Sequence, residues 1–197
     1  MISLSFSQTL MLMFSAIIVE NLIFSKLYGA SPFIKVSETP ITALGMGIVT
    51  SVAITLSSAL TWIVYHLILE PLGLEHLKTM AFILVIVALV QLLEMLLRRF
   101  TPSLYSSLRT YTPFIATNCA VLGCALLNIQ NNYNFIRSVC YGFAASIGFT
   151  LAIVIFAGVR ARIEFATPPR AFKEFPLTLI AAALLAMAFS GFSGIKL

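Results

Sequence analysis

Six apolar segments, each about as long as the hydrocarbon core of a membrane is thick, leave this chain few ways to fold. A helix that crosses a bilayer needs about 20 mostly apolar residues. The chain of 197 residues is 60% hydrophobic and only 10% charged, whereas a soluble domain carries about 25% charged residues. We therefore predict an all-α membrane protein that forms a single integral membrane domain over residues 1–197. The segments lie near 7–29, 41–66, 79–97, 112–129, 135–160 and 176–195.

The same composition excludes several kinds of function. Little chain is left outside the membrane for a soluble catalytic domain, and the sequence contains neither a G-x-x-x-x-G-K-[ST] phosphate-binding loop nor a G-x-G-x-x-G dinucleotide motif. The net charge of +5 is better explained by membrane topology than by nucleic acid, because so little aqueous surface remains. We expect no nucleic-acid partner and no catalysis by this chain alone.

The distribution of Lys and Arg predicts the orientation in the bilayer. Cytoplasmic loops of membrane proteins carry an excess of these residues. Nine of the twelve Lys and Arg residues lie in the connectors that follow the first, third and fifth segments. We therefore expect these connectors on the cytoplasmic side and both termini on the outer side.

The two halves of the chain share a pattern of small and polar residues. At an offset of 95, a stripe of small residues in the second segment matches one in the fifth, and this stripe is typical of close helix packing. Three segments per half is an odd number, so the second half must enter the membrane from the opposite side. We expect a 3+3 inverted repeat, with repeat one near 1–98 and repeat two near 99–197. The first set of matched residues is Ala43, Gly47, Ser51 and Thr55 with Ser138, Gly142, Ser146 and Thr150. The second set, at an offset of 97, is Ile18, Glu20 and Asn21 with Ile115, Thr117 and Asn118.

The fourth segment, Tyr111–Asn128, contains residues that interrupt a helix. It is a poor continuous helix because it contains Pro113, Thr117, Asn118 and Gly123. Irregular backbone at membrane depth is tolerated only inside protein or along a wet cavity. We therefore expect broken half-helices in the first and fourth segments. Cys119 lies at the centre of this one. Its thiolate suits iron–sulfur ligation, with the remaining ligands supplied by partners, and the alternative is a small buried hydrophobic residue.

The other two cysteines are interpreted as packing residues. Cys124 follows Cys119 by five residues, which is roughly 140° around a regular helix. The two thiols should not share a site unless the helix breaks between them. Cys140 has no distinguishing neighbours.

Two carboxylates lie in or at the ends of apolar segments. Because ionisable groups at membrane depth are costly, they usually face a protein interior or a water path. We interpret Glu20 and Glu94, with the amides Asn21 and Asn118, as candidates for an ion pathway. For Glu94 the alternative is an interfacial ion pair with Arg98, four residues later.

Several stretches together resemble one known family. They are GASPFIKVS, ALGMGIVTSV, AFILVIVALVQLLEMLLRRFTPSLY, TNCAVLGCALLNI, YGFAASIGFTLAIVIFAGVRARI and AFSGFSG. These resemble the RnfA/NqrE family, that is, the A-type membrane subunit of the Rnf complex and, more distantly, the E-type subunit of the Na⁺-translocating NADH:quinone reductase, Nqr. The likeness covers nearly the whole chain, and its T-N-C-A-V-L-G and Q-x-x-E-M-x-x-R-x-x-x-P-x-L-Y motifs are specific.

The resemblance implies a six-helix inverted repeat in the bacterial inner membrane, paired with a homologous E-type Rnf subunit of opposite orientation and accompanied by other Rnf subunits. It implies a [2Fe–2S] cluster shared by the two chains within the bilayer. Electrons would pass there between ferredoxin- or NADH-linked subunits and flavin-bearing subunits, coupled to movement of Na⁺ or H⁺.

Carried onto this sequence, the resemblance makes Cys119 of the T-N-C motif an iron ligand. The family's other ligand lies in a G-x-C-P-F setting, and here Ser31 stands where cysteine is expected. A serine oxygen is a harder and more basic ligand. Three interpretations remain open: an engineered substitution, a cluster with one oxygen or foreign ligand, and loss of the cluster. The stretch reads Gly29-Ala30-Ser31-Pro32-Phe33.

The sequence thus predicts a membrane electron-relay subunit of a Rnf-type ferredoxin:NAD oxidoreductase that couples electron transfer to Na⁺ or H⁺ translocation. Two other functions remain open. One is a redox-inactive ion transporter or channel-like module, which the inverted repeat and Glu20 would suit. The other is a scaffold that only anchors other subunits.

Overall fold

The computed structural model describes residues 6–29, 40–100, 118–163, 165 and 175–194, and all regular structure in these ranges is helical. The α-helices are α1 (Phe6–Ile18), α3 (Pro40–Val64), α4 (Lys78–Phe100), α7 (Cys119–Gln130), α8 (Phe135–Ile163) and α9 (Phe175–Ser190). A π-helical turn extends α3, and short 3-10 turns precede α4 and follow α9. They are η1 (Tyr65–Leu69), η2 (Glu75–Leu77) and η4 (Gly191–Gly194).

Three stretches of helix within the described residues are long and apolar enough to cross a membrane: Pro40–Leu69, Glu75–Arg99 and Phe135–Ile163. They coincide with the second, third and fifth predicted segments. The helices in the first, fourth and sixth predicted segments are shorter, with 13, 12 and 16 residues. The expectation of an all-α membrane protein is confirmed.

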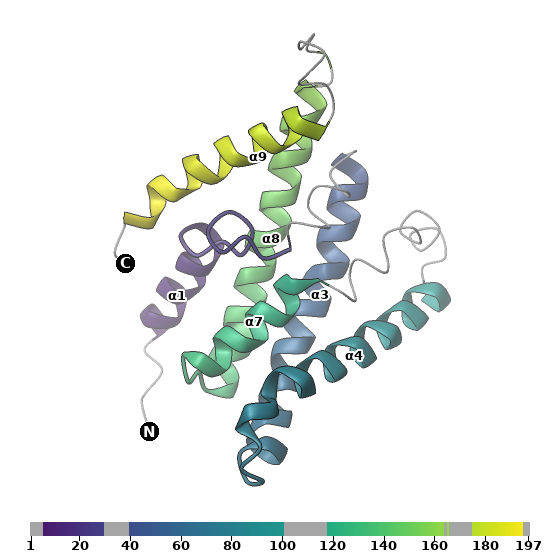
Figure 1. Ribbon diagram of the computed structural model, residues 1–197, viewed down its shortest axis with the longest axis vertical. Coiled ribbons are helices and arrows are strands. Elements are labelled where there is room, and N and C mark those ends of the chain that lie inside the picture. Colours follow the sequence, from purple (N-terminus) through teal and green to yellow (C-terminus); the bar gives the residue numbers. More distant parts are fainter. Residues whose placement is uncertain (1–5, 30–39, 101–117, 164, 166–174, 195–197) are drawn as a thin grey trace.

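The centre of the molecule is the pair α3 and α8 (Figure 1). Ser51 Oγ donates to the carbonyl of Ser146 at 3.2 Å and shares a 2.9 Å hydrogen bond with Thr150 Oγ1. A Cβ on Gly47 would lie 2.5 Å from Thr150 Cγ2. Residue numbers rise on one helix as they fall on the other, so the two helices are antiparallel. The small-residue stripes form this interface, which confirms the close-packing interpretation.

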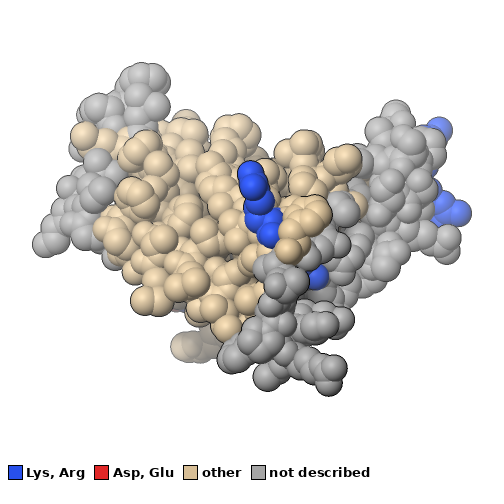
Figure 2. All heavy atoms as spheres, turned by 90° about the horizontal axis from the view of Figure 1, so that it is seen from above, with Lys and Arg blue, Asp and Glu red and all other residues tan. Residues whose placement is uncertain are grey.

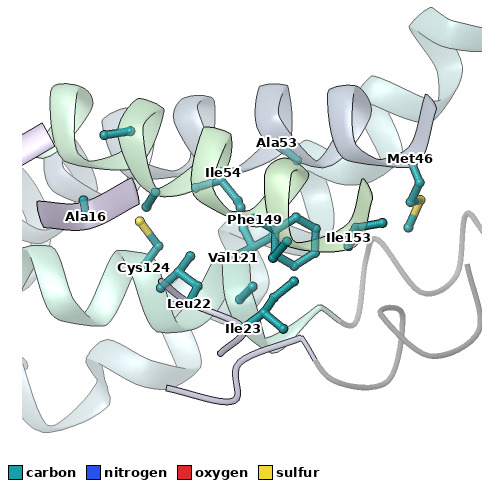
Figure 3. Close-up of a cluster of buried hydrophobic side chains, with 14 of the residues drawn as sticks. Ala16, Leu22, Ile23, Met46, Ala53, Ile54, Val121, Cys124, Phe149 and Ile153 are labelled. Carbon is teal, nitrogen blue, oxygen red and sulfur yellow. The ribbon is translucent and has the colours of Figure 1, made fainter. Parts of the chain in front are cut away.

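The hydrophobic core lies where the chain after α1, the helix α7 and the α3–α8 pair converge (Figure 3). Leu22 and Ile23, from the stretch after α1, lie beside Val121 of α7 and Phe149 of α8. All four are at most 3% exposed. Interiors packed this closely tolerate little change in volume, so the core fixes the position of the stretch after α1.

Helix α1 ends at Ile18, inside the first predicted segment. The amides of Val19 and Glu20 both donate to the carbonyl of Ser15, at 2.9 and 2.8 Å, so the helical ladder stops advancing there. Residues 19–29 then form a series of turns instead of a continued helix. The first segment is therefore helical only over its first part.

Asn21 ties these turns to α8. Its Oδ1 accepts from the amides of Ile23 at 3.0 Å and Phe24 at 3.4 Å. Its Nδ2 donates to the carbonyls of Ile17 at 3.1 Å and Gly148 at 2.8 Å. The side chain is 0% exposed, and these four bonds satisfy it. The turned backbone at residues 21–24 is thus buried in protein, as membrane interiors require.

Gly148 allows α1 and α8 to approach, and we expect Gly148→Ala to lower the free energy of unfolding by about 2 kcal/mol. A Cβ there would lie 2.8 Å from the carbonyl oxygen and 3.1 Å from the Cα of Ile17, both backbone atoms. The measurement is the midpoint temperature of unfolding in detergent. Gly158→Ala, on the same helix with nothing within 4 Å, is the control and should be neutral or slightly stabilising. Equal midpoints for the two variants would contradict this contact.

Basic residues gather at one end of the molecule. Helix α4 ends with Arg98 and Arg99, and α8 ends with Arg160 and Arg162. Since α3 and α8 are antiparallel and α4 follows α3 through a short connection, these ends lie on the same side. Figure 2 looks down on this end and shows Lys and Arg atoms, with no Asp or Glu atoms visible among the described residues. This is the end expected in the cytoplasm, and the orientation stays a prediction.

Candidate functional site

The two interrupted segments meet beside α8. Gly29 has a φ of 83°, in the left-handed region that glycine adopts without strain. A Cβ on Gly29 would lie 2.9 Å from Asn118 Oδ1 and 3.2 Å from the Cβ of Ala120. One residue earlier, the ring of Tyr28 covers Gly123, where a Cβ would lie 2.5 Å from Tyr28 Cδ2. The turns after α1 therefore lie directly against the first turns of α7.

Cys119 is the first residue of α7, and its side chain is exposed. Asn118 precedes it as the N-cap, with extended backbone at φ −74° and ψ 110°. The positive end of the helix dipole lies here and favours bound negative charge. The interpretation of Cys119 as a small buried hydrophobic residue is wrong, because its thiol faces outward from the described part of the chain.

The other two thiols are placed differently. Cys124 is 0% exposed, and its Sγ lies 3.6 Å from Ser58 Oγ in the core (Figure 3). Helix α7 runs unbroken from Cys119 to Cys124, so the two thiols point in different directions, as predicted. Cys140, on α8, is half-buried. The packing interpretation of Cys124 is confirmed.

A metal centre would need ligands from outside the described residues. The described residues contain no group of three or more His, Cys, Asp or Glu side chains that could hold a metal ion. Ser31, the second predicted ligand, lies outside the described residues. An iron–sulfur cluster takes four protein ligands, so the part of the chain described here offers one exposed thiol to a shared centre.

The amide of Asn118 bears on whether an iron–sulfur group fits beside Cys119. Its Oδ1 accepts from the amide of Ala120 at 3.0 Å. Its Nδ2 is buried and has no hydrogen-bond partner among the described residues. Leaving such a donor unsatisfied costs about 1–3 kcal/mol, and sulfur atoms of a cluster or a partner chain would accept from it. One exposed thiol, a helix N-terminus and a spare amide donor fit a contribution to a shared iron–sulfur centre.

We expect Asn118→Ala to lower the free energy of unfolding by about 1 kcal/mol, because alanine has no side-chain oxygen to cap α7. Asn118→Ser retains an oxygen at this position and should lose much less. The measurement is the unfolding midpoint of each variant in detergent. If the serine and alanine variants lose the same stability, capping is not what Asn118 contributes.

Glu20 lines a cavity of about 310 Å³ at the end of α1. The carboxylate follows the end of α1 by two residues and is half-buried. Two tyrosines share the cavity wall, and neither was among the residues predicted for a site. The sequence signal that could have identified Tyr141 is its polar hydroxyl within an otherwise apolar helix. The lining residues are Met11, Leu12, Ser15, Ala16, Glu20, Tyr133 and Tyr141.

The structure brings together only some of the residues predicted for an ion pathway. Glu20 and Asn21 are neighbours in the turn, and Asn118 touches the same turn through Gly29. Asn21, with its satisfied bonds, acts as a structural tie. Glu94 lies half-buried on α4, which packs against α3 and α7, and it does not line the cavity with Glu20.

Comparison with known proteins gives matches along nearly the whole chain. The family described as "Rnf-Nqr subunit, membrane protein" matches residues 9–196. The chain is 52% identical to the A-type subunit of the Na⁺-translocating ferredoxin:NAD⁺ oxidoreductase complex of Acetobacterium woodii, over 94% of this chain and 97% of that protein. It is 46% identical to the A-type subunit of the ion-translocating oxidoreductase complex of Syntrophotalea carbinolica, over 94% and 96%. It is 44% identical to the corresponding subunit from Vibrio cholerae, over 98% and 91%.

Proposed function

Because the chain belongs to the Rnf-Nqr family of membrane protein subunits, we propose that it is the A-type subunit of an ion-translocating ferredoxin:NAD oxidoreductase complex. Its role there is to relay electrons within the membrane and to couple that relay to movement of Na⁺ or H⁺. The identity to named subunits over nearly all of both chains supports the first part. Within the complex, a homologous subunit of the E type is its expected neighbour.

The observation that carries the electron-relay role is the exposed thiol of Cys119, at the point where two interrupted segments meet. A [2Fe–2S] cluster bound there would accept and release one electron at a time. Cys119 would hold iron, and the N-terminus of α7 would favour the negative charge of the bound group. Asn118 would donate its spare amide hydrogen. The partner chain, with or without Ser31, would supply the other ligands.

We also infer that residues 1–197 are built as an inverted repeat. In both halves a threonine bonds back to the carbonyl four residues earlier, Thr55 to Ser51 at 2.8 Å and Thr150 to Ser146 at 3.0 Å. Both break asparagines accept from the amide two residues later at 3.0 Å. The antiparallel packing of α3 and α8 supports the inversion. Exposed apolar stripes also match at an offset of 95, namely Ile48, Val52, Leu56 and Leu60 with Phe143, Ile147, Leu151 and Ile155.

The coupling proposal follows from the contact between the two interruptions. Negative charge that arrives beside Cys119 lies against the turns that carry Glu20 and Asn21, because Gly29 touches Asn118. Opposite charges attract strongly where water is scarce, so electron arrival favours a cation beside Glu20.

The test uses inverted membrane vesicles that contain the whole complex, given reduced ferredoxin and NAD⁺. We expect cation uptake that requires this chain, measured with radioactive sodium and a pH-sensitive dye. The purified chain alone in liposomes should pass no ions. Ion flux through the isolated chain would instead favour the transporter function, and uptake by vesicles that lack the chain would exclude the proposed role.

A further inference from the structure

The end of α1 makes one wall of the Glu20 cavity negative. A helix C-terminus carries partial negative charge on its free carbonyls, and α1 has no basic residue in its last turn. The carboxylate of Glu20 adds a full charge two residues beyond that end. Ser15, from the last turns of α1, also lines the cavity. Carbonyls and carboxylates at the end of an interrupted membrane helix are the usual ligands of small cations.

The opposite wall offers neutral oxygens. Tyr141 is 2% exposed and lines the cavity, and its hydroxyl is buried with no hydrogen-bond partner among the described residues. A buried hydroxyl in this state is costly unless something binds it. Tyr133, in the loop between α7 and α8, is the second phenol.

Tyr133 stays protonated at neutral pH. Burial first, and then the charge of Glu20, raise the pKa of Tyr133, although Arg137 and a hydrogen bond with Asn131 oppose the rise. The phenol therefore presents a neutral oxygen, and Glu20 is the only carboxylate that lines the cavity in the described part of the chain. One carboxylate with neutral oxygens balances a single positive charge, whereas divalent-ion sites gather several carboxylates.

We propose that this cavity binds one monovalent cation, Na⁺, held by the carboxylate of Glu20 and the phenolic oxygens of Tyr141 and Tyr133. The proposal rests on the proposed function only in naming that cation as the coupling ion. In the predicted orientation the loop between α7 and α8 is outside, so the site lies in the outer half of the membrane.

The test is carbodiimide labelling of Glu20 in the purified resting complex, without an electron donor, quantified by mass spectrometry. Dicyclohexylcarbodiimide attacks protonated carboxyl groups in apolar surroundings, so a bound Na⁺ slows the reaction. We expect Glu20 to label faster than the exposed Glu70. Protection of Glu20 by NaCl at fixed pH supports the site, and labelling that NaCl does not slow overturns it.

The variant Tyr141→Phe tests whether the phenol oxygen of Tyr141 takes part in cation binding in this cavity. We expect it to raise the protecting Na⁺ concentration by about tenfold. Tyr133→Phe should act in the same direction, and Tyr65→Phe, in the turn η1 after α3 and outside the cavity lining, should change nothing. Because the Tyr141 hydroxyl has no partner among the described residues, the phenylalanine variant should keep its unfolding midpoint. Labelling of Glu20 at the rate of Glu70, or labelling that both cavity variants leave unchanged, overturns the proposal.

This assay separates the two proposals. The assay requires neither electron transfer nor a cluster. In the Cys119→Ser variant, Glu20 should therefore be labelled at the same rate as in the unsubstituted protein. Failure of the cavity proposal would leave the electron relay intact. Failure of the relay would leave cation binding at Glu20 intact.

Discussion

Replacing Cys119 by serine is expected to lower ferredoxin-to-NAD electron transfer in the complex by at least about 100-fold, the upper range for loss of even an indirect metal contact. Cys119 is the exposed thiol at the meeting point of the two interrupted segments. A serine oxygen is a harder ligand that iron–sulfur centres accept poorly. The measurement pairs turnover with iron content and the low-temperature EPR spectrum of the purified complex.

Cys140→Ser is the matched control, since that thiol lies half-buried on α8 and not at the start of α7. It should keep both turnover and the EPR signal. Ser31→Cys, made in parallel, should change the g values if residue 31 is a ligand and leave them unchanged if it is not. Full turnover with an unaltered EPR spectrum in Cys119→Ser would remove this thiol from the mechanism and favour the scaffold function.

Gly29→Ala should lower the free energy of unfolding by about 3 kcal/mol, through two causes that add. The residue has a φ of 83°, which strains any side chain. The new Cβ would also lie 2.9 Å from both Asn118 Oδ1 and Phe149 Cε2. Relief would require the first turn of α7 to move, so we expect the EPR signal to broaden as well. The unfolding midpoint in detergent and the EPR line width are the two measurements.

Gly73→Ala separates the two causes. Gly73 has a φ of 66°, yet nothing lies within 4 Å of the Cβ that alanine would add. It should show only the backbone strain, about 1 kcal/mol, with an unchanged EPR spectrum. If the two alanine variants are equally stable, then the turns after α1 do not lie against α7 as the structure has them.

Much of the fold could be predicted because a membrane-spanning helix is a long run of apolar residues, which is visible in the local sequence. The second, third and fifth segments are long runs of apolar residues, and the same runs are the spanning helices. Close packing through the small-residue faces of α3 and α8 was also predictable, since Gly47, Ser51 and their counterparts recur every four residues on one helical face. Such features need only a length or a period along the chain.

The candidate site was predicted in part. The T-N-C stretch and its asparagine indicated where α7 begins, because asparagine is a strong N-cap. The sequence does not decide whether Cys119 is exposed or buried. Glu94 was grouped with Glu20 because both carboxylates lie in or beside apolar segments. Tyr141 was missed, since an aromatic residue in an apolar helix is normally interpreted as a core residue. Only the structure shows that its hydroxyl has no hydrogen-bond partner among the described residues.

By itself, the sequence determined that this chain lies in a membrane, where three helices long enough to cross it lie, and where α7 begins. These follow from hydropathy, helical period and capping, all properties of neighbouring residues. Only the tertiary structure decided that Gly29 lies against Asn118, that Cys119 faces outward while Cys124 is buried, and that Glu20 shares a cavity with two phenols. Those pairs come from distant parts of the chain, and their contact depends on how α1, α7 and α8 pack rather than on any local pattern.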